Sequence, residues 1–218
     1  AAALHGDYPE LEELVERFGS RQIRSQGTVV GNIANASPIG DWPPVLLALG
    51  ATLELVSTSG FRSVSVDAFS LDYRQTSLTD GEFIASIAIP RRDRKLFLRA
   101  YKISKRFEDD ISSVCAVAAL TMEGDDIVSA KVAFGGMAAV PKRASACEAA
   151  LIGKELNEAA IEDAMTALGG DFAPITDARA SAQYRSRVAG NLLKRLQLEF
   201  KGGAETRVHA HAQGASHG

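Results

Sequence analysis

The sequence predicts an α+β protein made of two successive units. Up to about residue 92, segments with a helical spacing of apolar residues are followed by segments that alternate apolar and polar side chains. Beyond that point, three strand-like segments come first and only helical patterns follow them. With 46% hydrophobic and 23% charged residues, the 218-residue chain has the composition of an ordinary folded protein. We therefore expect units at 1–92 and 93–201, and a disordered tail of Gly, Ala and His at 202–218.

The first expected element is a helix over 9–18, followed by a long irregular loop over 24–50. The apolar residues of the helix are Leu11, Leu14, Val15 and Phe18. The loop is rich in Gly, Asn, Ser and Pro, and its apolar end at 44–49 predicts a short helix. Long loops inside compact domains are more often functional than accidental, so this loop is the first candidate site.

The rest of the first unit is expected to be sheet. Segments 51–57 and 61–66 alternate around the turn Thr58-Ser-Gly60, which indicates a hairpin. A further strand is expected at 82–89, after the turn Thr79-Asp-Gly81.

The second unit is expected to be a three-stranded antiparallel meander with helices on one face. The strands are predicted at 96–102, 114–122 and 127–134. Helical patterns follow at 144–152, at 158–168 with Asn157 as N-cap, and at 181–201.

Composition and charge exclude several classes of function. A formal net charge of -3 and a pI near 5.9 provide no positive field for nucleic acid or an anionic membrane. Neither a signal peptide nor an apolar run of membrane-spanning length occurs, which predicts a cytoplasmic protein. Cys115 and Cys147 have neither disulfide nor metal-ligand spacing, and His209 and His211 lack a third ligand, so no metal site is predicted.

The loop supplies the one candidate binding pattern, over Gly27–Asn32 and Ser37–Asp41. Backbone N–H groups near glycines, with Thr28, Asn32 and Asp41, suit a diphosphate and ribose-like hydroxyls, although such loops are more often plain turns. Neither GxGxxG nor a Walker sequence occurs, and no catalytic acid, base or nucleophile is identified.

Two charged clusters have two interpretations each. Lys102–Asp110 is either a solvated loop that pairs with itself, which the residues alone favour, or a mobile gate beside a cofactor. Asp177–Arg185 is either an anion site or a cluster that anchors the start of the last helix to its domain, and the residues alone favour the second interpretation.

The run from Phe18 to Asp41 closely resembles the flavin-binding segment of xanthine dehydrogenases and related molybdenum hydroxylases. The resemblance is collinear over roughly residues 1–200. It continues through Tyr73-Arg74, Gly81-Glu82, Tyr101-Lys102, Arg106–Asp110, Gly135–Ala138 with Pro141, and 177–191.

This resemblance implies a fold and an activity. The fold would be the second half of a vanillyl-alcohol-oxidase-type FAD-binding domain, followed by a carbon monoxide dehydrogenase flavoprotein C-terminal domain. FAD would pass electrons from molybdopterin and two [2Fe-2S] clusters, held by partner domains or subunits, to NAD during purine oxidation. The other half of the FAD domain is expected to precede residue 1. The alternatives are a flavoprotein of another molybdenum hydroxylase, such as carbon monoxide dehydrogenase, or a flavin-free docking fragment.

The resemblance also implies site residues. Phe18 would lie near the isoalloxazine, Asp41 would bind the sugar-like portion, Ile84 would pack on the flavin and Lys102 would lie close to it. The diphosphate and ribityl chain would be lined by Thr28, Val29, Val30, Gly31 and Asn32. The loop 103–113 would affect access of NAD.

Val30 departs from the family pattern, which usually has a second glycine at this position. A β-branched residue rarely adopts positive φ and keeps a ligand away from the backbone. The departure therefore predicts weakened flavin binding.

Overall fold

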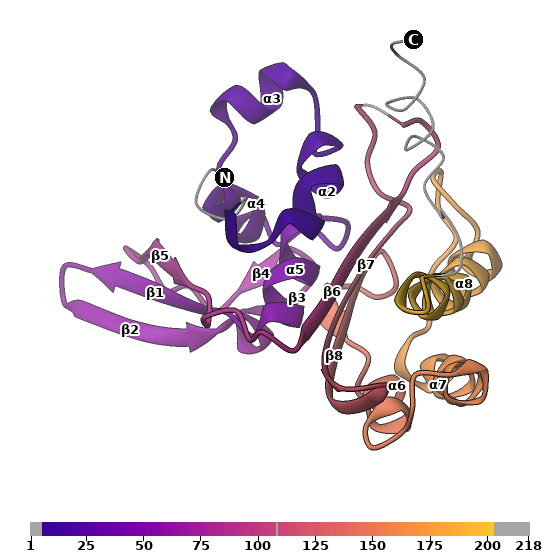
Figure 1. The fold of residues 1–218 in the computed structure, drawn as a ribbon. Helices are drawn as coiled ribbons and strands as arrows, with labels where there is room; N and C mark the ends of the chain where they lie inside the picture. Colours follow the sequence, from indigo (N-terminus) through magenta and orange to yellow (C-terminus); the bar gives the residue numbers. More distant parts are fainter. Residues whose placement is uncertain (1–5, 108, 203–218) are drawn as a thin grey trace, which may run out of the picture.

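The computed structural model describes residues 6–107 and 109–202 and has the α+β architecture expected from the sequence (Figure 1). The first expected helix forms as a 3-10 turn, η1 (Pro9–Leu11), that continues into α2 (Glu12–Glu16). Leu11 and Leu14 are buried, as their spacing predicts.

The expected loop at 24–50 is wrong in its first part, because two short helices occupy it. These are α3 (Arg21–Gln26) and α4 (Val29–Ala34), whose N-cap side chains Ser20 and Thr28 accept hydrogen bonds from backbone N–H groups of the first turn. Helix α4 contains a glycine and an asparagine, which are poor helix formers, and α3 is only six residues long, too short for a clear periodic pattern. The apolar helix that follows, α5 (Trp42–Leu49), is buried throughout.

The predicted hairpin and third strand form one antiparallel sheet of order β2-β1-β5. Its strands are β1 (Thr52–Ser57), β2 (Gly60–Ser65) and β5 (Phe83–Ala88). Between β2 and β5 lie η2 (Val66–Ala68), β3 (Ser70–Asp72) and β4 (Gln75–Thr76). This sheet projects to one side of the molecule (Figure 1).

The second sheet has four strands where three were expected, in the order β6-β7-β8-β9. The predicted meander is β6 (Leu96–Ile103), β7 (Val114–Glu123) and β8 (Asp126–Gly135). The additional strand, β9 (Lys142–Arg143), has two residues. A strand of that length carries no alternation, so no sequence pattern could indicate it.

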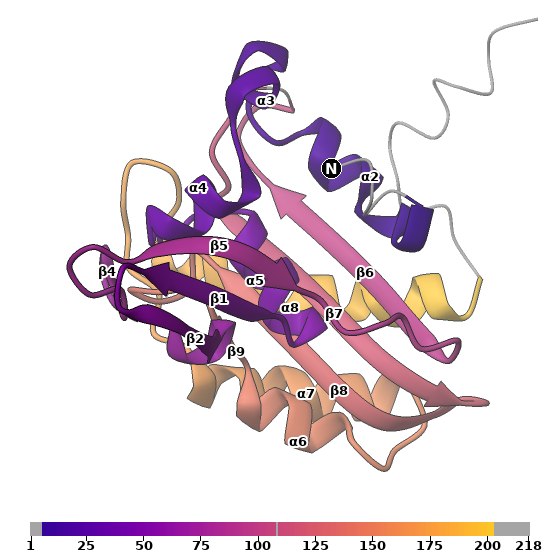
Figure 2. The same cartoon turned by 90° about the vertical axis from the view of Figure 1, so that its left-hand side faces the viewer.

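Three helices pack on one face of this second sheet (Figure 2). They are α6 (Ser145–Leu151), α7 (Glu158–Asp171) and α8 (Ala182–Phe200). Asn157 caps α7 as predicted, accepting a hydrogen bond from the N–H of Ala160, and Ser181 caps α8 in the same way.

The second sheet is buried on both faces. Residues such as Val114, Ala116 and Leu120 face α6–α8, while Val117 and Ala119 face α5 and the first unit. Figures 1 and 2 show β6–β8 between these two layers. The two expected units therefore share one sheet as a common wall.

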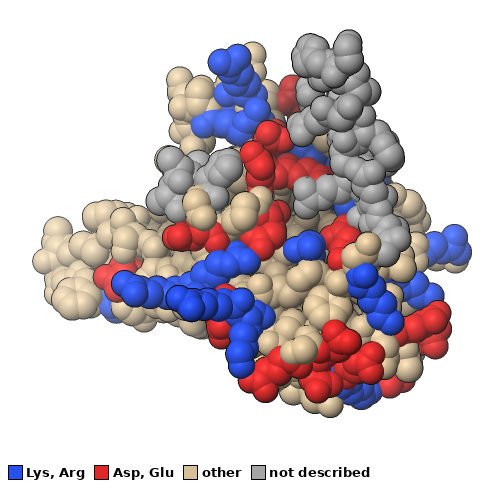
Figure 3. Space-filling view, in the orientation of Figure 1, with Lys and Arg blue, Asp and Glu red and all other residues tan. Residues whose placement is uncertain are grey.

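Within the described part of the chain, no helix combines the length and apolarity needed to cross a bilayer. The face in Figure 3 carries cations and carboxylates in separate small groups, without one sign dominating. Most of the expected tail, with His209 and His211, lies outside the described residues.

Candidate functional site

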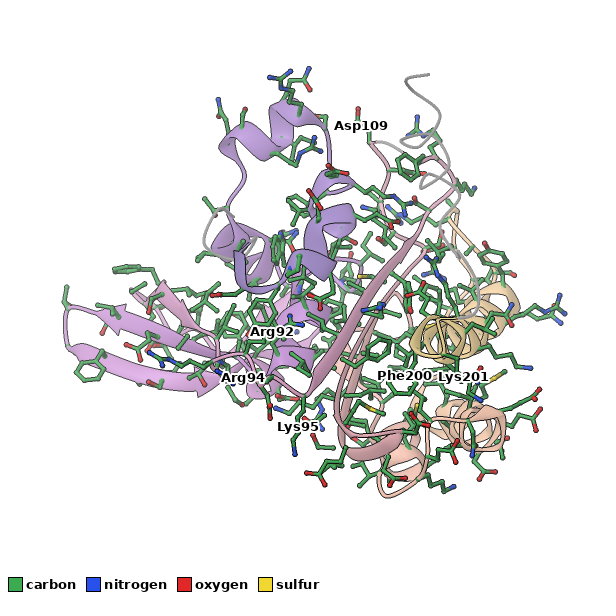
Figure 4. The ribbon with its side chains drawn as sticks, viewed as in Figure 1. Arg92, Arg94, Lys95, Asp109, Phe200 and Lys201 are labelled. Atoms are coloured by element: carbon green, nitrogen blue, oxygen red, sulfur yellow. The ribbon has the colours of Figure 1, made fainter. Side chains whose placement is uncertain are left out.

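A cavity of about 490 Å³ lies where the two units meet, below α3 and beside the β6–β7 loop. Asp109 lies in the middle of that loop, across from α3 (Figure 4). The lining residues are Phe18, Gly19, Ser20, Ile23, Asn32, Asn35, Ser37, Ile39, Gly40, Asp41, Lys102, Asp109, Asp110 and Ile111.

Four of the predicted site residues meet at this cavity: Phe18, Asn32, Asp41 and Lys102. Phe18 follows α2, Asn32 lies in α4, Asp41 directly precedes α5, and Lys102 lies in β6. The Phe18 ring packs edge-on against Trp42, with ring centroids 6.4 Å apart, which fixes it at the cavity wall.

Asn32 joins α4 to the start of α5. Its side-chain Oδ1 accepts a hydrogen bond from the N–H of Trp42 at 3.2 Å. A Cβ at Gly40 would lie only 3.2 Å from that same oxygen, so a glycine allows this close approach. The Asn32 amide nitrogen makes no hydrogen bond within the described residues and stays available to a ligand.

Asp41 and Lys102 form a buried ion pair on the cavity floor. The Lys102 Nζ lies 2.7 Å from the Asp41 Oδ2, and their side chains are 2% and 6% exposed, respectively. The other carboxylate oxygen, Oδ1, accepts a short hydrogen bond from the Ser112 hydroxyl. Both oxygens thus have protein partners, and the pair presents a polar but nearly neutral surface to the cavity.

Four predicted residues at the start of α4 do not line the cavity, namely Thr28, Val29, Val30 and Gly31. The Thr28 Oγ1 is used as the helix cap, accepting the N–H of Gly31 at 2.9 Å. Val29 and Val30 are half-buried and pack against the first core. Val30 has ordinary helical backbone geometry, so the positive φ that a valine would resist is not required there.

Ile84 is also absent from the cavity lining. It lies in β5, is 7% exposed, and packs in the core of the first unit. The resemblance placed it beside the flavin, but the described residues bring it only to the hydrophobic core.

Arg17 is a residue that the sequence analysis missed. Its guanidinium donates to the backbone oxygens of Lys102 at 2.8 Å and Phe107 at 3.3 Å, and to the Ser104 hydroxyl at 3.1 Å. It also stacks on the Phe107 ring, 4.5 Å from the centroid. Arg17 therefore fixes the charged loop that forms one cavity wall, and no local spacing signals this role.

The charged loop also pairs with itself, as its simpler interpretation predicts. The Asp110 carboxylate accepts the N–H groups of Arg106 and Ile111. The hydrogen bond from the Arg106 N–H is the main cause that lowers the pKa of Asp110. This ordering keeps Asp109 and Asp110 at the cavity rim.

The cysteines are buried and reduced. Burial raises the pKa of Cys115 well above its ordinary value and raises that of Cys147 to about 12. Residues 6–107 and 109–202 contain no group of three His, Cys, Asp or Glu side chains suited to a metal.

The comparisons with known proteins divide the chain between two neighbouring families. Residues 1–92 match the FAD binding domain in molybdopterin dehydrogenase, and residues 99–200 match the CO dehydrogenase flavoprotein C-terminal domain. The solved structure of reconstituted CO dehydrogenase from Oligotropha carboxidovorans matches with a TM-score of 0.84 and 30% identity, over 89% of this chain and 68% of that one. The chain belongs to the flavoprotein family of the molybdenum hydroxylases.

Curated relatives of this flavoprotein come from several enzymes. The glyceraldehyde dehydrogenase medium chain of Sulfolobus acidocaldarius is 34% identical over 83% of this chain. The xanthine dehydrogenase of Emericella nidulans is 37% identical over 76% of it. The chain spans 63% of the former protein and 12% of the latter.

The cavity suits one portion of the family's FAD. Its volume is in the range that holds a small organic ligand, and thus a part of a dinucleotide. Phe18 with Ile23, Ile39 and Ile111 provides apolar walls for a flat ring, and Asn32 provides a free amide. These groups suit the ring end of a flavin, whereas the resemblance assigns Asn32 to the diphosphate and ribityl chain and Asp41 to the sugar-like portion.

Proposed function

We propose that this flavoprotein holds the ring end of FAD in the cavity and forms part of the electron path of a molybdenum hydroxylase. The observation that carries the proposal is the convergence of Phe18, Asn32, Asp41 and Lys102, from four separate segments, on one cavity. Bound FAD would accept electrons and pass them to a second acceptor.

The chain's own residues would bind and orient the ring. Phe18 would bound one side of it, held by its contact with Trp42. The Asn32 amide would donate a hydrogen bond. The Asp41–Lys102 pair would supply a rigid polar floor whose charges already compensate each other, so ring binding would not require a net charge.

We further propose that the complete protein oxidises purines, with NAD as the acceptor and with iron-sulfur and molybdopterin partners. The resemblance of the Phe18–Asp41 run and the 37% identity to a xanthine dehydrogenase support this. The competing candidate is the flavoprotein of an aldehyde- or CO-oxidising enzyme. This chain spans 63% of the glyceraldehyde dehydrogenase medium chain and 68% of the CO dehydrogenase chain, but only 12% of the xanthine dehydrogenase. These larger shares support the competing candidate.

The first test is a titration of the chain with FAD, followed by flavin fluorescence and absorbance. It is done with the chain alone and with the preceding half-domain of a relative added as a separate polypeptide. Phe18→Ala should weaken binding about tenfold, corresponding to about 1.4 kcal/mol of lost contact. Phe61→Ala is the matched control, because Phe61 is 79% exposed on β2 and does not line the cavity.

Equal affinities of the two variants would contradict the placement of the ring at Phe18. Absence of binding under both conditions would instead support the flavin-free docking fragment.

The acceptor and the substrate require separate readouts. Anaerobic NADH should bleach the flavin absorbance if NAD is the acceptor. In the complex with its partner subunits, xanthine should bleach it and carbon monoxide should not. The reverse pattern would favour the CO-oxidising candidate.

A further inference from the structure

Arg185 is the most deeply buried charged residue among those described. It lies on α8, in the second unit, and is 1% exposed. Its Nη1 donates to the backbone oxygens of Ser113 and Gly136, the latter at 2.8 Å, and its Nη2 lies 2.7 Å from the Asp177 carboxylate. Burying a guanidinium is costly unless it is paired and hydrogen-bonded, so this geometry calls for an explanation.

The first acceptor, Ser113, adjoins the cavity floor. Ser113 directly follows Ser112, whose hydroxyl donates to Asp41. Asp41 in turn holds Lys102. A guanidinium that fixes the Ser113 carbonyl therefore fixes the segment that positions the Asp41–Lys102 pair.

The second acceptor, Gly136, is hydrogen-bonded to a segment that contributes to the cavity wall. While its carbonyl accepts from Arg185, its N–H donates to the Pro38 oxygen at 2.8 Å. The residues next to Pro38, namely Ser37, Ile39 and Gly40, line the cavity. One side chain from α8 thus connects to two walls of the site through backbone groups.

The packing around Gly136 leaves no room for a side chain at that position. Gly136 has a φ of 82°, and a Cβ there would lie 2.3 Å from the Ser113 oxygen and 2.9 Å from Nη1 of Arg185. The planar fork of arginine places donors on separate nitrogens and can serve two carbonyls and a carboxylate at once, whereas all three donors of a lysine ammonium diverge from one nitrogen and cannot span the same three acceptors. Arginine is therefore specifically suited to this position.

Asp177 compensates the buried charge. Partial burial tends to raise the pKa of Asp177, but the N–H groups of Ala180 and Arg179 and the Arg185 guanidinium outweigh it, and the pKa is lowered. The carboxylate thus stays charged and holds Nη2 while Nη1 serves the two carbonyls.

We propose that Arg185 is a positioning residue for the cavity: it fixes the floor through Ser113 and the wall at Pro38–Gly40 through Gly136. That the ligand positioned in this way is a flavin rests on the proposed function. This role differs from merely anchoring α8 to its domain, because it predicts that loss of Arg185 loosens the cavity segments specifically.

The test compares Arg185→Lys with Arg187→Lys, a matched control two residues along the same helix that is exposed. Hydrogen exchange of the full chain without FAD is followed by mass spectrometry. Arg185→Lys should accelerate exchange about tenfold in peptides covering 37–42 and 112–113 and at Gly136, because about 1.4 kcal/mol of local stability corresponds to that factor. Peptides of β1 and α7 and the melting temperature should change little, and Arg187→Lys should change nothing.

FAD affinity is the second readout, and it should fall about tenfold in Arg185→Lys. If the wild-type chain binds FAD neither alone nor with the added half-domain, the proposed function fails, but the exchange comparison still tests the positioning role. If Arg185→Lys does not fold, Asp177→Asn removes the charge that strengthens the bond to Nη2 while keeping an acceptor oxygen, and should show the same local pattern with an increase of about threefold. Uniform acceleration across the chain, or unchanged exchange at 37–42, would overturn the proposal.

Discussion

Buried charged side chains determine the geometry of the cavity. Asp41 and Lys102 pair with each other, Arg17 holds the loop wall and Arg185 connects the floor to α8. A buried ion pair contributes little net stability but makes the loss of one partner expensive. These residues therefore specify a geometry more than they stabilise the fold.

The Asp41–Lys102 pair gives a prediction at this scale. Lys102→Met leaves the Asp41 carboxylate buried with only its bond to Ser112, and should lower the free energy of unfolding by about 3–5 kcal/mol. The double variant Lys102→Met with Asp41→Asn should lose less than the single variant, because no unpaired charge remains. Urea unfolding at pH 7 measures both. A double variant less stable than Lys102→Met would contradict the view that the unpaired charge is the main cost.

Individual elements depend on local contacts that the sequence encodes. The caps Ser20, Thr28, Asn157 and Ser181 each accept a backbone N–H at the start of a helix. The hairpin of β1 and β2 is connected to the turn before β5 by the pair of Arg62 and Glu82, with an Nε–Oε1 distance of 2.7 Å.

The cap of α7 gives a prediction at the scale of one element. Asn157→Ala should reduce the free energy of unfolding by about 1 kcal/mol, because the N–H of Ala160 loses its acceptor. Asn157→Asp should retain nearly all of the wild-type free energy of unfolding, because an aspartate oxygen also accepts this N–H. Chemical unfolding of the three proteins measures the difference, and a loss shared by both variants would show that the cap bond is not the cause.

The pair of Arg62 and Glu82 predicts a pH dependence. The hydrogen bond from Arg62, with a further one from the N–H of Thr79, lowers the pKa of Glu82 to about 2. Since the folded pKa is below the unfolded value, the stabilisation is present above about pH 4.5 and is lost as the pH falls toward 2. The difference in stability between the wild type and Glu82→Gln should therefore shrink between those pH values.

The control for that prediction is Glu155→Gln, which removes the same charge from a residue with no ion pair within the described part of the chain. Acid unfolding followed by circular dichroism compares the three proteins. A pH-independent difference for Glu82→Gln would mean that its carboxylate is not stabilised by Arg62.

The whole molecule is organised around the β6–β8 sheet, which both units use as a wall. Strand β7 is nearly continuously apolar and buried because both of its faces are covered, and β8 is buried in the same way over its last four residues. Separation of the units would expose one entire face of the sheet, so we expect them to unfold together.

Cooperative unfolding can be checked with the single tryptophan. Trp42 lies in α5, in the first unit, while the long helices α7 and α8 belong to the second. Tryptophan fluorescence and the helical circular dichroism signal should therefore give the same midpoint in urea. Two midpoints would show that the units unfold independently.

Sequence patterns by themselves determined most of the elements of this protein. The strands β1, β2 and β5–β8 and the helices α6–α8 follow from local periodicity and from caps such as Asn157, which act over a few residues. The run from Phe18 to Asp41 also indicated the family, because it is long and specific. The short helices α3 and α4 and the short strands β3, β4 and β9 were missed because they carry too little periodic signal.

Only the tertiary structure decided which residues form the site. In the folded chain Asp41 pairs with Lys102, and Arg185 donates to the Ser113 carbonyl. Thr28 caps α4 and Ile84 packs in the core of the first unit, so neither lines the cavity. These outcomes depend on contacts between residues far apart in the chain, whose partners no local spacing specifies. Burial then gave the contacts their strength, because charges and hydrogen bonds interact strongly only where water is excluded.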